Sequence, residues 1–411
     1  MRILSLSLEN IGPFDKAELQ FIADPEQEKA PVTLITGENG AGKSIILDAI
    51  RAMFGQHYCN PERPIWRKGV PFRVGMDVLI DGKSQLINSA AIGDGNSFER
   101  TVAATSFNLA PMFVKSAAAL PDFVTDFWRT TQATDPYEIQ GFTRVDHRAL
   151  LSGSLQGTYS NREVTNLICS FDYLRDAHVA REKRTGEVLF EVTKRIFELS
   201  LLNGHFDEVE RLTMTPMVFQ SGQRVPLANV SGGNAYLIQH MISLLGKMFS
   251  YHFLRGTEPE EICNAPGLLL IDETENCLHP RWQKRFLTNV QSIFPNLQII
   301  ATTHSPFILS SVPHARVFVC KFDGKSSVVT EETSDYVNQP VEEILVSRAF
   351  DETQPFNEVI SNLLRERKQA IRGGNAELRR QIEAQLLEKN PEYFSYFAVD
   401  ERLDIIRGAA E

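Results

Sequence analysis

Long apolar runs and paired cysteines are both missing from this 411-residue sequence. No stretch approaches the roughly 18 consecutive apolar residues that a membrane-spanning helix requires. The first residues alternate polar and apolar side chains as a strand does, so they lack the apolar core of a signal peptide. We therefore expect a cytoplasmic protein that makes no membrane contact.

Basic residues are fewer than acidic residues. Asp and Glu number 52 against 42 Lys and Arg, which gives a formal net charge of −10. That balance excludes a protein that coats nucleic acid with a generally basic surface, although it leaves room for a local basic patch. The hydrophobic share of 43% excludes wholesale disorder, because a chain of this composition can bury a core.

Cysteine is rare, and its spacing matches no known framework. None of Cys59, Cys169, Cys263, Cys277 and Cys320 forms a CxxC pair, and the gaps between them fit neither a zinc site nor a set of disulfides. We expect five ordinary buried thiols in a reducing compartment.

Apolar periodicity predicts a chain in which strands and helices alternate. The N-terminal part reads as two strands over 1–22, a strand over 32–36, a helix over 43–54 and an antiparallel lobe over 72–114. The middle part reads as helices over 117–131, 161–202 and 233–253, with a strand over 217–220. The last part reads as a strand over 268–271, a helix over 280–293, a strand over 298–302, a short helix over 306–311, a hairpin over 316–331 and a helical tail over 340–411.

A glycine-rich turn between a β-branched strand and an amphipathic helix carries the first recognisable chemistry. The segment 37–44 reads GENGAGKS and matches the pattern G-x-x-x-x-G-K-[ST] of phosphate-binding loops. Its glycines allow consecutive backbone N–H groups to surround phosphate oxygens, and the helix N-terminus adds partial positive charge. Lys43 would reach the β- and γ-phosphates of a nucleotide, and Ser44 would give its hydroxyl to Mg²⁺. The predicted nucleotide-binding residues here are Gly37, Asn39, Gly40, Gly42, Lys43 and Ser44.

Two acids follow a strand that reads as buried on both faces. Residues 268–271 are Leu-Leu-Leu-Ile, a run typical of a central parallel strand, and Asp272 and Glu273 come directly after it. Ligands of open α/β sheets bind at the carboxyl ends of the strands. We therefore predict that Asp272 holds Mg²⁺ and that Glu273 orients or deprotonates an attacking water. Without the phosphate loop, the pair would read as two solvated acids.

Two weaker motifs complete the set by their order in the chain. His304 follows the next predicted strand, where it could sense a γ-phosphate, although a lone histidine is more often structural. Ser231, Gly232 and Gly233 precede a long predicted helix. Ser231 can cap that helix, and the glycine N–H groups can bind an anion. Taken alone, a plain helix cap explains this turn equally well.

In this order, the four motifs resemble those of the ATP-binding cassette ATPases of the SMC and RecF kind. The resemblance covers about residues 1–330 and includes the opening segment 8–14, LENIGPF. It implies an α/β fold, namely a P-loop ABC-type ATPase head with an antiparallel β lobe, a helical insertion and a C-terminal helical tail. It also implies ATP and Mg²⁺ as cofactors, Glu273 and His304 as catalytic residues, and Ser44 and Asp272 as metal ligands. The signature turn at 231–233 would bind the ATP held by a second head.

Several residues depart from that family pattern. Asn234 stands where the signature usually has Glu or Gln, Thr274 where many relatives have proline, and His279 where transporter cassettes have an aspartate. His279 with the proline after it is instead similar to OLD-like and other stand-alone bacterial ATPases. Gln132 and Gln140 are candidates for the magnesium-contacting glutamine, with nothing in the sequence to support either.

The stretch 341–408 resembles the tail of ATPase subunits from bacterial anti-phage systems such as Septu (PtuA-like), in which a neighbouring nuclease is the effector. No acidic cluster of the TOPRIM kind follows the ATPase motifs, so a built-in nuclease is not expected. The insertion also shows none of the sustained heptads of SMC arms. The resemblance thus implies a homodimer of ATP-sandwiched heads with a partner effector such as an HNH-type nuclease.

Three basic clusters lie before the antiparallel lobe, in the insertion and in the tail. They comprise Arg63, Arg67, Lys68 and Arg73; Arg181, Lys183 and Arg184; and Arg365, Arg367, Lys368, Arg372, Arg379 and Arg380. They could contact nucleic-acid phosphates, but solvated helix faces are the commoner explanation of such clusters.

Three functions therefore stay open. The chain is an ATP-hydrolysing dimeric head that gates an effector in anti-phage defence, a RecF-like or SMC-like DNA-repair ATPase that clamps nucleic acid, or a slow-hydrolysing nucleotide-sensing scaffold. A transporter subunit is a weaker fourth reading. We expect four parts: an N-terminal ATPase half over 1–114, a mostly helical insertion over 115–228, a C-terminal ATPase half over 229–335 and a helical tail over 336–411.

Overall fold

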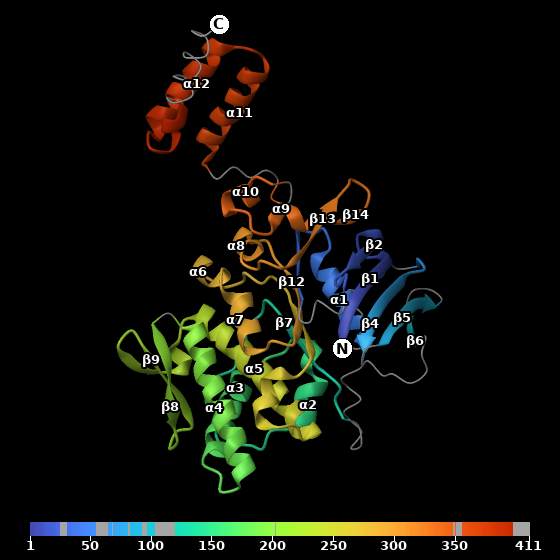
Figure 1. Cartoon of the computed structure of the whole chain (residues 1–411), viewed down its shortest axis with the longest axis vertical. Coiled ribbons are helices and arrows are strands. Elements are labelled where there is room, and N and C mark those ends of the chain that lie inside the picture. The colour runs from blue at the N-terminus through green and yellow to red at the C-terminus, as the bar shows by residue number, and fades with distance from the viewer. Residues whose placement is uncertain are drawn as a thin grey trace. The chain divides into compact units, whose positions relative to one another are not determined.

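The structure divides into two compact units, Met1–Ile344 and Leu345–Glu411, which are described separately. The computed structural model describes residues 1–24, 31–54, 65–67, 69–80, 83–92, 97–102, 120–201, 203–347, 350 and 356–397 (Figure 1). This division falls inside the tail that we predicted from residue 336. The short helix α9 (Thr333–Tyr336) precedes the division, and α10 (Val341–Leu345) ends at it.

A six-stranded sheet forms the centre of the first unit. Its strands are β3 (Val32–Gly37), β7 (Val124–Trp128), β11 (Gly267–Ile271), β12 (Leu297–Thr302), β13 (Arg316–Phe322) and β14 (Ser327–Glu331). They lie in the order β14-β13-β3-β12-β11-β7, and all neighbours are parallel except the β13–β14 hairpin. β3, β7, β11 and β12 are buried along their whole length, and β11 is accordingly a continuous apolar run after its first glycine. The predicted α/β fold class is confirmed.

The register of this sheet brings the ends of its strands to one edge. Thr302 at the end of β12 lies one position beyond the pair Ala301–Ile271, and it faces Ile35 of β3. On the other side of β3, Cys320 of β13 pairs with Gly37. Segments that follow these strands therefore emerge side by side, although they are far apart in the chain.

Strand β7 is the main error of the sequence-based assignment. The sequence predicts a helix over 117–131, whereas residues 124–128 pair in parallel with β11, with Val124 opposite Gly267 and Trp128 opposite Ile271. Its β-branched and aromatic residues do favour a strand. Asp126 interrupts their apolar pattern, yet it is fully buried.

A buried ion pair explains why Asp126 is accepted there. Lys247 Nζ donates to Asp126 Oδ1 at 2.8 Å, and both side chains are at least nine-tenths buried. The Tyr159 hydroxyl and the Trp128 indole N–H donate to the same carboxylate at 3.0 and 2.9 Å. Lys247 belongs to helix α5 (Gly232–Arg255), so the pair joins this helix to the edge strand of the sheet.

The antiparallel lobe packs against the central sheet through helix α1 (Lys43–Phe54). Its strands are β1 (Arg2–Ile11), β2 (Phe14–Gln20), β4 (Arg73–Ile80), β5 (Lys83–Ile92) and β6 (Ser97–Val102), in the order β2-β1-β4-β5-β6. Gln298 on β12 joins the two sheets, because its amide accepts from Ile3 N at 2.7 Å and donates to Ile3 O at 2.8 Å. The predicted lobe is confirmed over β4 to β6, and its proposed extension to 114 lies outside the described residues.

The region between β7 and β11 is a helical layer with a small sheet at one side (Figure 1). Its helices are α2 (His147–Ser152), α3 (Asn161–Arg175), α4 (Ala180–Ser200) and the long α5. The helix predicted over 161–202 is therefore interrupted at 176–179. Residues 203–230 contain three strands where the sequence predicts one, namely β8 (Gly204–Glu210), β9 (Thr215–Gln220) and β10 (Gln223–Pro226).

Short helices follow the remaining strands. The helix predicted over 280–293 is divided into α6 (Pro280–Gln283) and α7 (Phe286–Ile293), and α8 (Pro306–Leu309) follows β12. In the second unit, the predicted helical tail contains α11 (Glu358–Arg372) and α12 (Ala376–Lys389), which form a hairpin about Gly373 and Gly374. No helix in the described part of the chain is both long and apolar enough to cross a membrane.

The four predicted parts remain a proposal with one amendment. Because β7 pairs with β11, it belongs to the sheet and not to the insertion that we expected from residue 115. The insertion then begins after Trp128.

Substituting Lys247 tests the buried ion pair. We expect Lys247→Met to lower the free energy of unfolding of the first unit by about 3–5 kcal/mol, because the Asp126 carboxylate stays buried without its counter-charge. Urea unfolding followed by tryptophan fluorescence measures this loss. Lys183→Met on the exposed face of α4 is the matched control. Equal stability of the two variants would contradict the structural role of the pair.

Candidate functional site

The glycine-rich segment 37–44 connects the end of β3 to the start of α1, as the sequence predicts. Gly37 has a φ of +127°, and a Cβ atom there would lie 1.9 Å from the Cys320 carbonyl oxygen. Gly42 has a φ of +100°, and a Cβ there would lie 2.6 Å from the ring of Phe14. Only glycine fits the backbone path at these two positions.

The side chain of Lys43 lies folded along this loop. Its Nζ donates to the carbonyl oxygens of Gly37 at 3.0 Å and Glu38 at 2.7 Å. Burial lowers the pKa of the Lys43 ammonium, and the carboxylates of Asp272 and Glu275 oppose that shift. A nearly buried ammonium that is held only by neutral carbonyls is suited to accept a stronger, anionic partner.

The acid pair meets the phosphate loop at the sheet edge. Ser44 Oγ donates to Asp272 Oδ1 at 2.9 Å, and Thr302 Oγ1 donates to the same oxygen at 2.7 Å. Thr302 thus joins the ends of β11 and β12, and it is a site residue that the sequence reasoning missed. Its place in the last position of a parallel strand was the available signal.

Glu273 lies in a strained turn directly after Asp272. Its φ is +50°, in the left-handed region that disfavours a side chain, and its N–H donates to Thr302 Oγ1 at 2.8 Å. The side chain is exposed. The turn therefore directs the chain away from the sheet and leaves the Glu273 carboxylate accessible to solvent.

A cavity of about 220 Å³ lies between these motifs. It is lined by Asn39, Gly40, Gly42, Lys43, Ser44, Ile45, Glu273, Thr302 and His304. His304 is half-buried there, and burial together with the Lys43 ammonium lowers the pKa of its imidazole, while Glu273 and Asp272 oppose the shift. The structure thus brings together the phosphate loop, the acid pair and the histidine around one opening.

The signature turn lies elsewhere in the chain's own structure. Ser231 occupies the N-cap position of α5, but its side chain makes no capping hydrogen bond, which gives no support to the alternative that this turn is a plain helix cap. Ser231 and Gly232 are exposed, and a Cβ on Gly233 would lie 2.4 Å from the Cys277 carbonyl oxygen. None of the three residues of the signature turn lines the 220 Å³ cavity.

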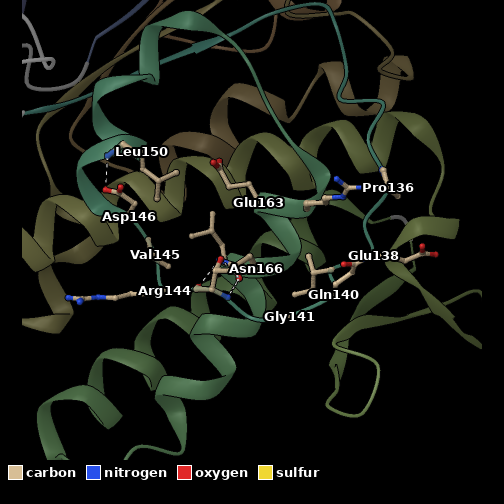
Figure 2. Close-up of a pocket in the computed structure, with 15 residues that line it drawn as sticks. Pro136, Glu138, Gln140, Gly141, Arg144, Val145, Asp146, Leu150, Glu163 and Asn166 are labelled. Atoms are coloured by element: carbon tan, nitrogen blue, oxygen red, sulfur yellow. Dashed lines mark hydrogen bonds between the residues drawn. The ribbon is translucent and has the colours of Figure 1, made fainter.

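Neither candidate glutamine reaches the phosphate loop. Gln132 Nε2 donates to the Gly232 carbonyl at 3.3 Å, so it contacts the signature turn. Gln140 lines a larger cavity of about 990 Å³ beside α3, together with Glu138, Arg144 and Glu163 (Figure 2). The magnesium-contacting glutamine therefore remains unassigned.

The residues that depart from the family pattern have local structural roles. Thr274 is fully buried, and its hydroxyl donates to the Thr302 carbonyl at 2.7 Å. His279 caps α6, where its Nδ1 accepts from Arg281 N at 3.3 Å. Asn234 is buried in the first turn of α5.

The prediction of buried thiols is only partly correct. Cys169 and Cys320 are buried and Cys263 is partly buried, whereas Cys277 is exposed at a turn with a φ of +60°. Cys59 lies outside the described residues. Within the described part of the chain, no three His, Cys, Asp or Glu residues cluster as a metal site of their own.

Many arginines of the basic clusters are engaged within the chain. Arg67 pairs with Asp15 at 2.6 Å, Arg184 with Glu260 at 2.7 Å, and Arg181 donates to two backbone carbonyls. In the second unit, Arg367 and Arg379 both pair with Glu383. Arg73, Lys183, Arg365, Lys368, Arg372 and Arg380 are exposed, and Arg63 and Lys68 lie outside the described residues. This pattern favours the explanation that the basic clusters are solvated surface residues over the explanation that they form a continuous surface for nucleic acid.

The oxygen atoms at the sheet edge are of the types that bind a magnesium ion. Mg²⁺ prefers hydroxyl, carboxylate and phosphate oxygens, usually with one or two protein ligands and several waters. Ser44 Oγ and Asp272 Oδ1 are such a pair, and they already lie 2.9 Å apart beside Lys43.

Comparison with protein families gives two matches. Residues 5–94 match an "AAA domain", and residues 132–310 match an "AAA domain, putative AbiEii toxin, Type IV TA system". The first match contains the phosphate loop, and the second contains the signature turn, the acid pair and the histidine. The chain is an ATPase, and two of its segments match AAA domains. The two matched segments are the two halves that the central sheet joins.

Curated relatives of this ATPase agree with the resemblance seen in the motifs, which is thereby confirmed. The Septu protein PtuA of Bacillus thuringiensis is 24% identical over 370 residues, covering 86% of this chain and 85% of that protein. The "Retron Vc95 probable ATPase" of Vibrio cholerae serotype O1 biovar El Tor is 22% identical over 164 residues, covering 40% of this chain. The match spans 31% of the retron protein's own length.

Solved structures similar to this ATPase include SMC heads. The SMC head domain from Thermotoga maritima is 14% identical, with 80% of this chain and 99% of that chain covered and a TM-score of 0.46. An Smc head domain bound to the C-terminal domain of ScpA, derived from Pyrococcus furiosus, is 15% identical, with coverages of 80% and 96% and a TM-score of 0.48.

Two alanine substitutions in the phosphate loop test its backbone geometry. Gly40 has a φ of +79° with nothing within 4 Å of a Cβ, so Gly40→Ala should cost only the left-handed strain of about 1–2 kcal/mol. Gly37→Ala should destabilise the ATPase more, because its Cβ meets the Cys320 carbonyl. Thermal unfolding measures both, and equal unfolding temperatures would contradict the close approach of β3 and β13.

Proposed function

We propose that this ATPase binds Mg·ATP in the cavity beside Lys43 and hydrolyses it as one head of a cytoplasmic homodimer, and that this cycle gates an effector in anti-phage defence. The observation that carries the proposal is the bond between Ser44 Oγ and Asp272 Oδ1. These oxygens belong to the phosphate loop and the acid pair, 228 positions apart, and they lie 2.9 Å from each other.

The residues of the phosphate loop would bind the nucleotide. A bound Mg²⁺ supplies positive charge to the β- and γ-phosphates, and Ser44 and Asp272 are the residues that would hold it. Lys43 would exchange its two carbonyl acceptors for phosphate oxygens. The backbone N–H groups of Asn39, Gly40 and the following residues would complete the phosphate site.

Glu273 and His304 would act on the γ-phosphate. In hydrolysis, a water oxygen forms a bond to the γ-phosphorus, the bond from that phosphorus to the ADP oxygen breaks, and the water gives up a proton. Glu273 is exposed and lines the cavity, and its carboxylate would orient that water and accept its proton. His304 also lines the cavity, and a ring N–H of its imidazole would donate to a phosphate oxygen.

The position of the signature turn supports a dimer. Ser231 and Gly232 are exposed and do not line their own chain's cavity, so they are available to a nucleotide held by a second head. In this arrangement each ATP lies between the phosphate loop of one protomer and the signature turn of its partner.

The defence role rests on the relatives. The Septu protein PtuA is similar to this chain over most of both lengths, and a retron ATPase is similar over a shorter segment. The resemblance of the tail to Septu ATPases supports a separate effector, such as an HNH-type nuclease. The internal pairing of many cluster arginines gives no support to the RecF-like alternative of direct nucleic-acid clamping.

Two substitutions separate nucleotide binding from hydrolysis. We expect Lys43→Ala to weaken ATP binding at least about tenfold, because the phosphates lose their buried cation. Glu273→Gln should keep ATP binding and reduce turnover about 100-fold or more, because the amide cannot accept the proton. Fluorescent-nucleotide titration and phosphate release measure the two effects.

The matched controls are Lys183→Ala and Glu182→Gln, which change exposed residues of α4. Both controls should behave as the natural protein does. Normal ATP binding by Lys43→Ala, or undiminished turnover by Glu273→Gln, would show that the site is assigned to the wrong residues.

Native mass tests assembly and distinguishes the scaffold alternative. The Glu273→Gln variant should form dimers with ATP and Mg²⁺, and co-expression with the product of the neighbouring gene should yield a stable complex. Ser231→Arg should block the ATP-dependent dimer, because a bulky side chain would occupy the partner's phosphate site. A protein that stays monomeric under every condition would contradict the proposal, and assembly without any measurable turnover would favour the scaffold.

A further inference from the structure

The segment that follows the acid pair contacts three different parts of the ATPase within three consecutive residues. Glu275 contacts the loop that carries His304, and Asn276 Nδ2 donates to the Thr130 carbonyl after β7 at 2.6 Å. The Cys277 carbonyl lies against Gly233 of the signature turn. Of these three residues, only Glu275 makes its contact through a charged side chain, and it belongs neither to the motifs nor to the proposed catalytic residues.

The Glu275 carboxylate holds the histidine loop with both of its oxygens. Oε1 accepts from the backbone N–H of His304 at 2.7 Å, and Oε2 accepts from Thr303 Oγ1 at 2.7 Å. Thr303 is fully buried and Glu275 is partly buried. Charge-assisted hydrogen bonds of this length are among the stronger ones in proteins, so the main chain of His304 is fixed relative to the end of β11.

Further hydrogen bonds anchor the same loop from its other side. Ser305 N donates to Thr303 Oγ1 at 3.0 Å, and Ser305 Oγ donates to Gln283 Oε1 at 2.6 Å. Gln283 Nε2 in turn donates to the Leu278 carbonyl at 2.8 Å. The loop carrying His304 is therefore tied at both ends to the segment 275–278.

These contacts distinguish Glu275 from the acids of the proposed mechanism. Glu275 does not line the cavity, whereas Glu273 and His304 do. Its two oxygens already accept hydrogen bonds from the histidine loop, so it is not placed as a base or a metal ligand. Its hydrogen bonds reach the cavity through the position of its neighbour His304, and its charge also opposes the lowering of the pKa of the Lys43 ammonium.

We propose that Glu275 is a positioning residue that fixes His304 against the phosphate cavity, and that it affects the rate of hydrolysis far more than nucleotide affinity. The proposal rests on the proposed function, since it requires ATP to be hydrolysed in this cavity. The imidazole of His304 must meet a phosphate oxygen within hydrogen-bond distance, and releasing its backbone N–H would allow the whole loop to shift.

A set of variants tests this role. Glu275→Ala should lower kcat for ATP about 10- to 100-fold and leave the ATP dissociation constant within about twofold. Glu275→Gln should retain much of the activity, because its amide oxygen can still accept from His304 N. Thr303→Val, which removes one of the two anchors, should give a smaller loss than Glu275→Ala. Glu182→Ala on α4 is the matched control, and near-UV circular dichroism verifies that each variant is folded.

A double-mutant cycle with His304 separates positioning from general destabilisation. If Glu275 acts through His304, then Glu275→Ala combined with His304→Ala should turn over ATP no more slowly than His304→Ala alone, within about twofold. Multiplied losses in the double variant, or a loss of affinity as large as the loss of kcat, would overturn the proposal.

Lys43→Ala and Glu273→Gln, assayed beside these variants, distinguish failure of the positioning role of Glu275 from failure of the proposed function. Loss of turnover in both, together with undiminished turnover in Glu275→Ala, would refute the positioning role and leave the proposed function standing. Undiminished turnover in Lys43→Ala and Glu273→Gln would refute the proposed function itself and this role with it.

Discussion

The parallel alignment of β3, β12 and β11 is the constraint on which the rest of this structure depends. Parallel strands place all their carboxyl ends at one edge of a sheet, whatever the length of chain between them. The phosphate loop follows β3, the acid pair follows β11, and the histidine follows β12. One hydrogen bond, from Ser44 to Asp272, therefore joins a residue that precedes the helical layer in the sequence to one that follows it.

The helical layer is held to this sheet by a second polar contact. Asp126 on the edge strand and Lys247 on the longest helix form an ion pair inside the protein, supported by Tyr159 and Trp128. A buried pair of this kind contributes less to stability than apolar packing would, but it tolerates only one alignment of strand and helix. We infer that it fixes where α5, and with it the signature turn at its start, lies relative to the sheet.

Two residues outside the motifs hold the motif residues in position. Thr302 holds Asp272 and receives the N–H of Glu273, and Glu275 holds the backbone of His304. Neither Thr302 nor Glu275 belongs to a pattern that the sequence analysis used, because their partners lie about 30 positions away and are defined by strand register. Lys43, Ser44 and Asp272 could be predicted, because their chemistry requires a fixed spacing to a strand or a helix.

The sequence by itself determined the α/β class, the strands β3, β11 and β12, the phosphate loop and the order of the motifs, because each depends on contacts between near neighbours in the chain. Tertiary structure decided that residues 124–128 form a strand, since the charge of Asp126 is neutralised by a lysine 121 positions away. It also decided that the Ser231 side chain makes no capping hydrogen bond and that Gln140 lies beside another cavity. Each of these outcomes depends on a partner that is distant in sequence, and local periodicity carries no information about such partners.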